Sequence, residues 1–311
     1  MTTLLERPEV TKAEPAVVAS RRRAGLRREL LGLLFLAPAL LVFGLFSWWP
    51  IVRGLLISFQ ETNLVDPAVW VGLENFQAVL TDPLVGTAMT NTLLFVGLGL
   101  VIGFPAPIVL AAVMSTVRRF AGVYRVVVYL PVVVPPVVAI LLWKWFYDPG
   151  SGLFNQLLGL IGLGPYPWLQ SPHTAMLSLV LEATWAGMGG AALIYLAAMT
   201  GVPAELYEAA ESDGAGIWRR IWHVLLPQLR PVIGLLLLLQ LIGTIQVFTE
   251  PYIFTQGGPD DATLTVLLLI FRYAFQDGRY GQAAALSVLL ALVLAVLSAV
   301  YLRLTRSWST K

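Results

Sequence analysis

Six long apolar segments constrain the fold of this chain more than any other feature of its sequence. Each reaches the ~20 residues that a helix needs to cross the hydrocarbon layer of a membrane, and each is apolar around its whole circumference. The two-residue alternation of a barrel strand is missing from them. The sequence therefore predicts an all-α membrane protein with six transmembrane helices, at about residues 30–52, 88–113, 123–147, 174–200, 231–250 and 282–302.

Charged residues support the same class and indicate an orientation. They make up only 12% of the chain, against about 25% in soluble domains. The stretches before residue 30 and at 114–125, 201–231 and 303–311 hold 16 of the 20 lysines and arginines. Because basic residues concentrate on the cytoplasmic side of membrane proteins, we expect both termini and the 201–231 segment in the cytoplasm.

The N-terminal residues 1–29 are polar and basic and contain no apolar core of the signal-peptide type. We expect them to form a disordered cytoplasmic tail ahead of an uncleaved first helix, with residues 30–311 as the transmembrane domain.

Several other segments have recognisable patterns. Segment 71–83 predicts a short outer helix and a turn, 148–173 an external loop, and 262–275 a re-entrant or interfacial helix that is too short to span. Prolines inside the second and third spans are interpreted mainly as packing kinks: Pro105, Pro107, Pro131, Pro135 and Pro136. Glu182 and Glu250 fall near the outer ends of two spans. For Glu182, a carboxylate at the water interface is as good an explanation as a role in transport.

The chain offers no set of residues for chemistry of its own. None of its three lysines follows a glycine-rich phosphate-binding loop, so ATP binding by that route is not predicted. His173 and His223 fall on opposite sides of the membrane in the expected topology, and there is no cysteine, so no metal site is predicted. We therefore predict neither an enzyme, nor a bound cofactor, nor a nucleic-acid partner.

The cytoplasmic segment 203–227 is polar although it lies between two apolar spans. Four residues suit the first turn and the end of a helix: Pro203, Glu205, Glu208 and Gly214. Apolar residues then recur at helical spacing: Ile217, Trp218, Ile221 and Trp222. The pattern predicts two short helices joined by a turn, the second ended or bent by Pro227.

Two interpretations of this segment are open on physical grounds. In one, Ala209 and Ala210 let the backbone lie close to a partner protein, Leu206 and Tyr207 fill a pocket, and acidic side chains such as Asp213 pair with basic residues across the interface. In the other, the segment is an amphipathic helix resting on the bilayer surface, which Trp218 and Trp222 would suit.

The spacing within the segment resembles a known family motif. Glu208-Ala209-Ala210, three residues, Gly214, nine residues and Val224 to Pro227 are similar to the Glu-Ala-Ala loop of binding-protein-dependent ABC importer permeases, with Val224 where the family has Ile. Val71–Phe76, Thr255–Pro259 and Tyr280–Gly281 resemble the carbohydrate-uptake branch. The likeness covers most of the chain beyond the N-terminal tail.

The resemblance implies the type I ABC importer permease fold and a set of partners. In the family, this loop docks as a coupling helix on a separate ATPase dimer, which binds ATP and Mg. A second, similar six-span permease and an extracytoplasmic solute-binding protein complete the transporter in a prokaryotic inner or sole cell membrane. The coupling residues are then Glu205, Tyr207, Glu208, Ala209, Ala210, Asp213, Gly214, Leu226 and Pro227.

The resemblance further implies a sugar or sugar derivative as solute, with an amino-acid or peptide permease, or an ATPase-independent secondary carrier, as the alternatives. A sugar path needs hydrogen-bonding side chains and aromatic faces around a hollow. The fourth and fifth spans, where the family contacts its solutes, supply candidates that packing between helices would explain equally well: Trp185, Gly187, Gln240, Gly243, Thr244 and Val247.

Overall fold

The computed structural model of the protein describes residues 32, 34–116 and 120–305. The predicted N-terminal tail at 1–29 lies outside these residues. The chain divides into two units between Leu56 and Ile57. In the described part of the first unit, an apolar helix runs from Leu34 through a π-helical stretch η1 (Gly44–Trp48) into α2 (Trp49–Ile57), whose last residue belongs to the second unit.

The second predicted span is one long apolar helix, Pro83–Thr116. It consists of α4 (Pro83–Leu98), the π-helical turn η2 (Gly99–Gly103) and α5 (Pro105–Thr116). The Asp82 side chain caps its start by accepting a hydrogen bond of 2.8 Å from the Leu84 amide. Because Pro105 has no amide hydrogen and its ring crowds the preceding turn, a widened π turn just before it lets the helix continue.

The third predicted span, 123–147, differs from the single helix that its composition indicates. It forms α6 (Ala121–Val133) and α7 (Pro136–Phe146), and their axes differ by 97°. Val134 and Pro135 between them are both extended, with ψ values of 129° and 133°. Since a residue that precedes proline disfavours the helical conformation, two consecutive prolines break this span rather than kink it.

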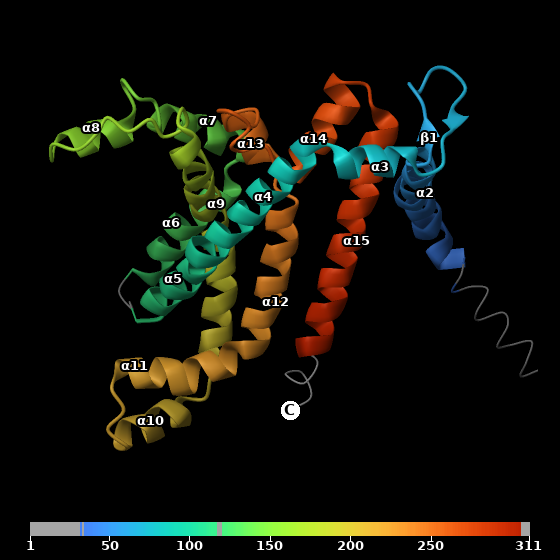
Figure 1. Ribbon diagram of the computed structural model, residues 1–311. Helices are drawn as coiled ribbons and strands as arrows, with labels where there is room; N and C mark the ends of the chain where they lie inside the picture. Colours follow the sequence, from blue (N-terminus) through green and yellow to red (C-terminus); the bar gives the residue numbers. More distant parts are fainter. Residues whose placement is uncertain (1–31, 33, 117–119, 306–311) are drawn as a thin grey trace, which may run out of the picture. The chain divides into compact units, whose positions relative to one another are not determined.

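The fourth span is α9 (Pro172–Thr200), which starts at a Ser171 cap. The fifth is longer than the predicted 231–250. Its helix runs from α11 (Ile217–Arg220) through the π-helical η3 (Ile221–Leu225) into α12 (Leu226–Ile245), and α13 (Thr249–Phe254) follows. Pro227 does not end this helix, because the π-helical η3 directly before α12 widens the turn and lets the helix continue past the proline. Figure 1 shows the helix bending between α11 and α12.

The sixth span is α15 (Tyr280–Thr305). Short elements at one end of the spans join them: strands β1 (Gln60–Glu61) and β2 (Val69–Trp70), α3 (Glu74–Thr81), α8 (Leu153–Gly159), α14 (Val266–Phe271) and the π-helical η4 (Arg272–Gln276). The two strands pair antiparallel. Helix α10 (Ala204–Ser212) and α11 lie at the other end of α9 and α12 (Figure 1).

Packing around α9 depends on the absence of a side chain at Gly189. A Cβ atom there would overlap the carbonyl oxygen of Val128 in α6, so the two helices approach backbone to backbone. One residue further along, a Cβ atom at Gly190 would lie 3.9 Å from the Val132 side chain, an ordinary contact distance. Adjacent glycines on one helix thus have different roles.

We predict that Gly189→Ala destabilises the fold by ~1–3 kcal/mol, because the methyl group must push α6 away from α9. Gly190→Ala is the matched control and should be neutral or stabilising, since alanine favours a helix by about 1 kcal/mol over glycine. Thermal unfolding midpoints in detergent measure both. Equal midpoints for the two variants would contradict the close approach at Gly189.

Candidate functional site

Helix α10 ends in a turn that requires glycine. Gly214 has a φ of +71°, and no atom lies within 4 Å of the place where its Cβ would be, so backbone conformation and not space selects glycine here. The Gly214 amide donates to the Glu211 carbonyl (3.0 Å) and the Ala215 amide to the Ala210 carbonyl (2.9 Å). This is the Schellman arrangement, which satisfies the last carbonyls of a helix and reverses the chain.

The outer face of α10 is polar and exposed. No residue of the helix is buried, and Glu205, Glu208 and Ala209 are all exposed. Tyr207 points the other way and packs against the core formed by α5, α9 and α12, where burial raises the pKa of its hydroxyl. A contact of 3.4 Å between Arg220 and Glu211 joins α11 to α10. Tyr207 therefore holds α10 to its own chain, while the acidic and alanine positions stay available.

The remaining predicted loop residues lie in the turn and at the base of the fifth span. Asp213 caps the C-terminal end of α10 just before Gly214. Leu226 and Pro227 are half-buried at the start of α12, between the buried side chains of Leu225 and Leu229. They anchor the end of the loop and do not belong to its exposed face.

A cavity of about 280 Å³ lies between the second, fourth and fifth spans. Apolar residues form most of its wall, including Phe95, Phe104, Leu236 and Leu239. Polar side chains are few in it, and they come from two helices: Thr184 and Tyr195 of α9, and Gln240 and Thr244 of α12. A mainly apolar hollow with a few convergent polar groups is the usual form of a small-molecule site.

The π-helical turn η2 makes room for the polar groups of α12. Gln240 donates its side-chain amide to the Gly99 carbonyl (2.8 Å), which also accepts the Phe104 amide at 2.8 Å. A Cβ atom at Gly103 would lie 3.3 Å from Gln240 Nε2 and 3.1 Å from Thr184 Oγ1, and one at Gly99 would lie 3.5 Å from Thr244 Cγ2. The missing side chain at Gly103 therefore leaves room for Gln240 and Thr184, whereas a Cβ atom at Gly99 would make an ordinary contact.

The structure brings three of the six predicted path residues together, namely Gly187, Gln240 and Thr244, which line this cavity. The other three lie elsewhere. Trp185 packs against Trp143 of α7, with ring centroids 5.5 Å apart. Gly243 faces open space, and Val247 is buried, with its carbonyl accepting a hydrogen bond of 3.0 Å from Thr265.

Two polar residues of the cavity, Thr184 and Tyr195, were not among the sequence candidates. Helical spacing could have indicated them, since positions 184, 187, 191 and 195 fall on one face of α9.

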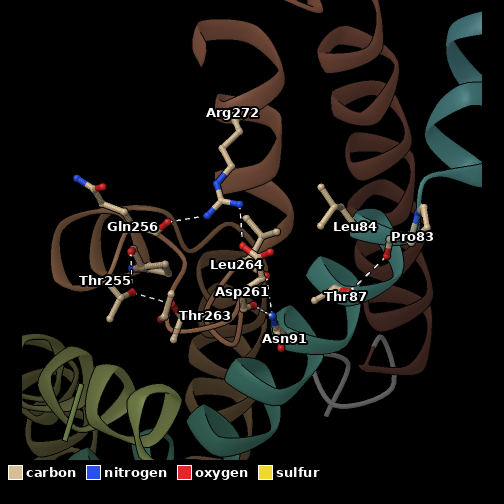
Figure 2. Close-up of polar contacts among 12 residues, drawn as sticks. Pro83, Leu84, Thr87, Asn91, Thr255, Gln256, Asp261, Thr263, Leu264 and Arg272 are labelled. Atoms are coloured by element: carbon tan, nitrogen blue, oxygen red, sulfur yellow. Dashed lines mark hydrogen bonds and ion pairs between the residues drawn. The ribbon is translucent and has the colours of Figure 1, made fainter. Parts of the chain in front are cut away.

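A polar network at the opposite end of the spans from α10 fixes the segment between α13 and α14 (Figure 2). Arg272 pairs with the Asp261 carboxylate at 2.8 Å and donates to the Gln256 carbonyl at 2.7 Å. Asn91 of α4 donates to the carbonyls of Asp261 (2.7 Å) and Leu264 (3.0 Å). The Arg272 contacts therefore hold the segment between α13 and α14 in one conformation, and the Asn91 hydrogen bonds attach it to the second span.

Glu182 is not at a water interface within this chain. Its side chain is 1% exposed, and its Oε2 atom has no hydrogen-bond partner in the described residues. Glu250 lies close enough to interact with it electrostatically, and the buried Tyr147 is also nearby. The carboxyl group belongs to the packed region between α7, α9 and α13 and does not line the cavity.

Comparisons with known proteins agree with this geometry. A family model described as "Binding-protein-dependent transport system inner membrane component" matches residues 103–309. The probable ABC transporter permease protein YurN of Bacillus subtilis (strain 168) is 35% identical, over 88% of this chain and 94% of YurN. The lactose transport system permease protein LacF of Rhizobium radiobacter is 33% identical, over 90% of this chain and 96% of LacF.

Solved structures extend the likeness to three dimensions. A chain from the crystal structure of a bacterial ABC transporter involved in the import of the acidic polysaccharide alginate superposes with a TM-score of 0.83 at 28% identity, covering 94% of this chain and 100% of that one. A second structure holds the alginate transporter in complex with a periplasmic protein bound to an alginate pentasaccharide, and its chain matches with a TM-score of 0.82. The predicted fold class is thereby confirmed.

We predict that Asp261→Asn destabilises the loop at 255–263 by about 1 kcal/mol, because the Arg272 guanidinium loses its charged partner in a half-exposed site. Asp260→Asn is the matched control, since Asp260 is exposed and makes no ion pair within the described chain. The φ angle is 49° at Asp260 and 55° at Asp261, and asparagine tolerates such positive values. Each substitution therefore changes the charge of the side chain and little else. Limited proteolysis of the loop at 255–263 should be faster only for Asp261→Asn, and equal rates in both variants would contradict the role of the pair.

Proposed function

Because this chain belongs to the family of binding-protein-dependent transport system inner membrane components, we propose that it forms half of a solute path and couples that path to a separate ATPase through α10. One observation carries the proposal most directly. The loop with the exposed helix α10 joins the two helices, α9 and α12, that supply the polar residues of the cavity.

Coupling follows from helix continuity in this proposal. The descending helix α9 ends at Thr200, only a few residues before α10, and the loop returns through α11 and η3 into α12 without a helix end. A displacement of α10 by a partner would therefore tilt both helices that line the cavity. The partner binds ATP and Mg and hydrolyses the nucleotide, while this chain transmits the movement.

The exposed residues of α10 suit a protein partner. Glu205 and Glu208 offer negative charge to basic side chains, and Ala209 leaves the helix backbone close to the surface. Tyr207, which holds the helix against its own core, acts as a positioning residue and not as a contact. A helix resting on the bilayer would instead need a continuous apolar face, whereas the exposed residues of α10 around Leu206 are acidic or alanine and Tyr207 is half-buried.

The cavity has the form of one half of a larger site. Its volume of about 280 Å³ lies below the ~300–1,000 Å³ of pockets that enclose small molecules. Gly187, on its wall, is exposed. We propose that a second, similar permease closes the path on this side, that an extracytoplasmic binding protein delivers the solute to it, and that an ATPase dimer serves both permeases.

A sugar or sugar derivative is the proposed solute. Relatives over most of this chain's length are named for lactose and for arabinooligosaccharide transport, and the solved neighbour imports alginate. The hydroxyl and amide groups of the cavity can hydrogen-bond a carbohydrate, and Phe95 and Phe104 offer apolar surface to its rings. The chain is proposed to lie in a prokaryotic cell membrane with both termini in the cytoplasm.

We predict that Gly214→Ala reduces solute-stimulated ATP hydrolysis and uptake by the assembled transporter, because a side chain at a φ of +71° costs ~1–2 kcal/mol and shifts the turn. Gly216→Ala is the matched control, since a Cβ atom there also meets open space but the backbone is not left-handed. Uptake of labelled disaccharides by proteoliposomes measures the effect. If Gly214→Ala, with the ATPase still bound, couples ATP hydrolysis to uptake as fully as the wild type, the proposed role of this turn in coupling is wrong.

A further inference from the structure

The segment between α9 and α12 carries two exposed surfaces of opposite charge. Every charged residue of α10 and of the turn after it is acidic and exposed: Glu205, Glu208, Glu211 and Asp213. Between Asp213 and Glu250 the chain has no aspartate or glutamate, and its charged residues there are arginines. A surface that attracts the acidic helix repels the basic stretch, so the two are expected to face different partners.

The basic surface lies on α11 and η3. Arg219, Trp222 and His223 are three or four residues apart, so they fall on one side of this helix, and all three are exposed. The Trp222 side chain is 64% exposed. Leu225 is buried instead and packs into the core with residues of α9 and α12. The helix is therefore amphipathic, and an aromatic ring lies between basic side chains on its outer side.

Two arginines of this region have no acidic partner. Arg220 contacts Glu211 at 3.4 Å, whereas neither Arg219 nor Arg230 forms an ion pair with another described residue. Both of these arginines are exposed. A guanidinium group binds phosphate oxygens through two parallel hydrogen bonds, and tryptophan favours the boundary between lipid headgroups and hydrocarbon. An exposed tryptophan beside unpaired arginines therefore matches the headgroup of an anionic phospholipid.

The position of this segment along the fifth span fits that ligand. The apolar run of α12 begins directly after Arg230 and Pro231. Trp222 precedes Arg230 by eight residues, which is ~12 Å along a straight helix and more than the ~5–8 Å depth of a headgroup layer. Figure 1 shows the helix bending between α11 and α12, so α11 and η3 run across the end of the span and not straight away from it.

We propose that Arg219, Trp222 and Arg230 form a binding surface for anionic phospholipid headgroups in the leaflet next to α10. Charge complementarity favours lipid, because the phosphates of this leaflet attract exposed basic residues close to a span. Leu235, further along α12, is 58% exposed, so exposed apolar surface continues from this segment into the span.

The proposal goes beyond the proposed function, since neither the solute nor the ATPase contacts this surface. It also assigns the two physical interpretations of residues 203–227 to different parts of the segment. Helix α10 contacts a protein, whereas α11 and η3 rest on the bilayer. Headgroups bound there hold the piece of chain that joins α10 to α12.

A fluorescent label at His223 tests the proposal directly. The chain has no cysteine, so His223→Cys labelled with bimane gives a single exposed reporter on this surface. The complete transporter, with cysteine-free partner subunits, is placed in phosphatidylcholine vesicles. These vesicles contain a small, equal fraction of either brominated phosphatidylglycerol or brominated phosphatidylcholine. Bromine quenches bimane only at short range, so the ratio of the two quenching efficiencies measures the local preference for the anionic lipid.

We expect brominated phosphatidylglycerol to quench more strongly, and this preference to fall by ~5-fold in Arg219→Gln, the effect of one arginine near a membrane surface. Arg219→Lys keeps the charge and should retain most of the preference. Arg125→Gln is the matched control, because Arg125 is also exposed and forms no ion pair with another described residue, but belongs to α6. It should leave the preference unchanged.

Three results would overturn the proposal. Equal quenching by the two lipids would show that anionic headgroups do not gather at this surface. An equal loss of preference in Arg125→Gln and Arg219→Gln would show that net charge, and not this surface, attracts the lipid. Quenching that appears only after the ATPase is removed would show that the surface contacts a protein. None of these measurements depends on the solute, so the proposed sugar path is tested separately.

Discussion

Helical continuity through α9 and α12 is the constraint on which the rest of this structure depends. In hydrocarbon, each backbone group must find its partner within the helix, so these segments behave as stiff rods. The two helices are connected through α10 and α11 at one end, and they line the cavity further along. The position of α10 is therefore linked to the shape of the cavity. Tyr207 packs α10 against these helices, and the Arg220–Glu211 contact joins α10 to α11.

Polar groups within the spans are accommodated by local departures from α-helical geometry. The π-helical turn η2 widens the second span just before Pro105, and its carbonyl at Gly99 accepts two hydrogen bonds, one of them from Gln240. The cavity therefore depends on the same feature that lets the helix tolerate a proline. A proline interpreted from the sequence as a packing kink is thus connected to the wall of the cavity that we propose as the solute path.

The sequence was sufficient to predict the fold class and the turn at Gly214, because apolar length and glycine spacing act locally. The third span was predicted wrongly, because Pro135 and Pro136 were interpreted as a packing kink, whereas two consecutive prolines hold Val134 and Pro135 extended and break the helix. Within the cavity, Gln240 and Thr244 were recognisable from spacing, whereas Tyr195 reads as an ordinary apolar-face residue. Only the three-dimensional packing reveals that its hydroxyl lacks a partner.

Contact between α10 and an ATPase is the central claim, and cross-linking tests it most directly. The chain has no cysteine, so a single one introduced at the exposed Ala209 gives an unambiguous product. The account predicts that Ala209→Cys cross-links to the ATPase in the assembled transporter, with a yield that changes when ATP binds, and that Leu160→Cys, in the predicted external loop, does not. Absence of a cross-link from Ala209→Cys in a complex that still transports solute would contradict it.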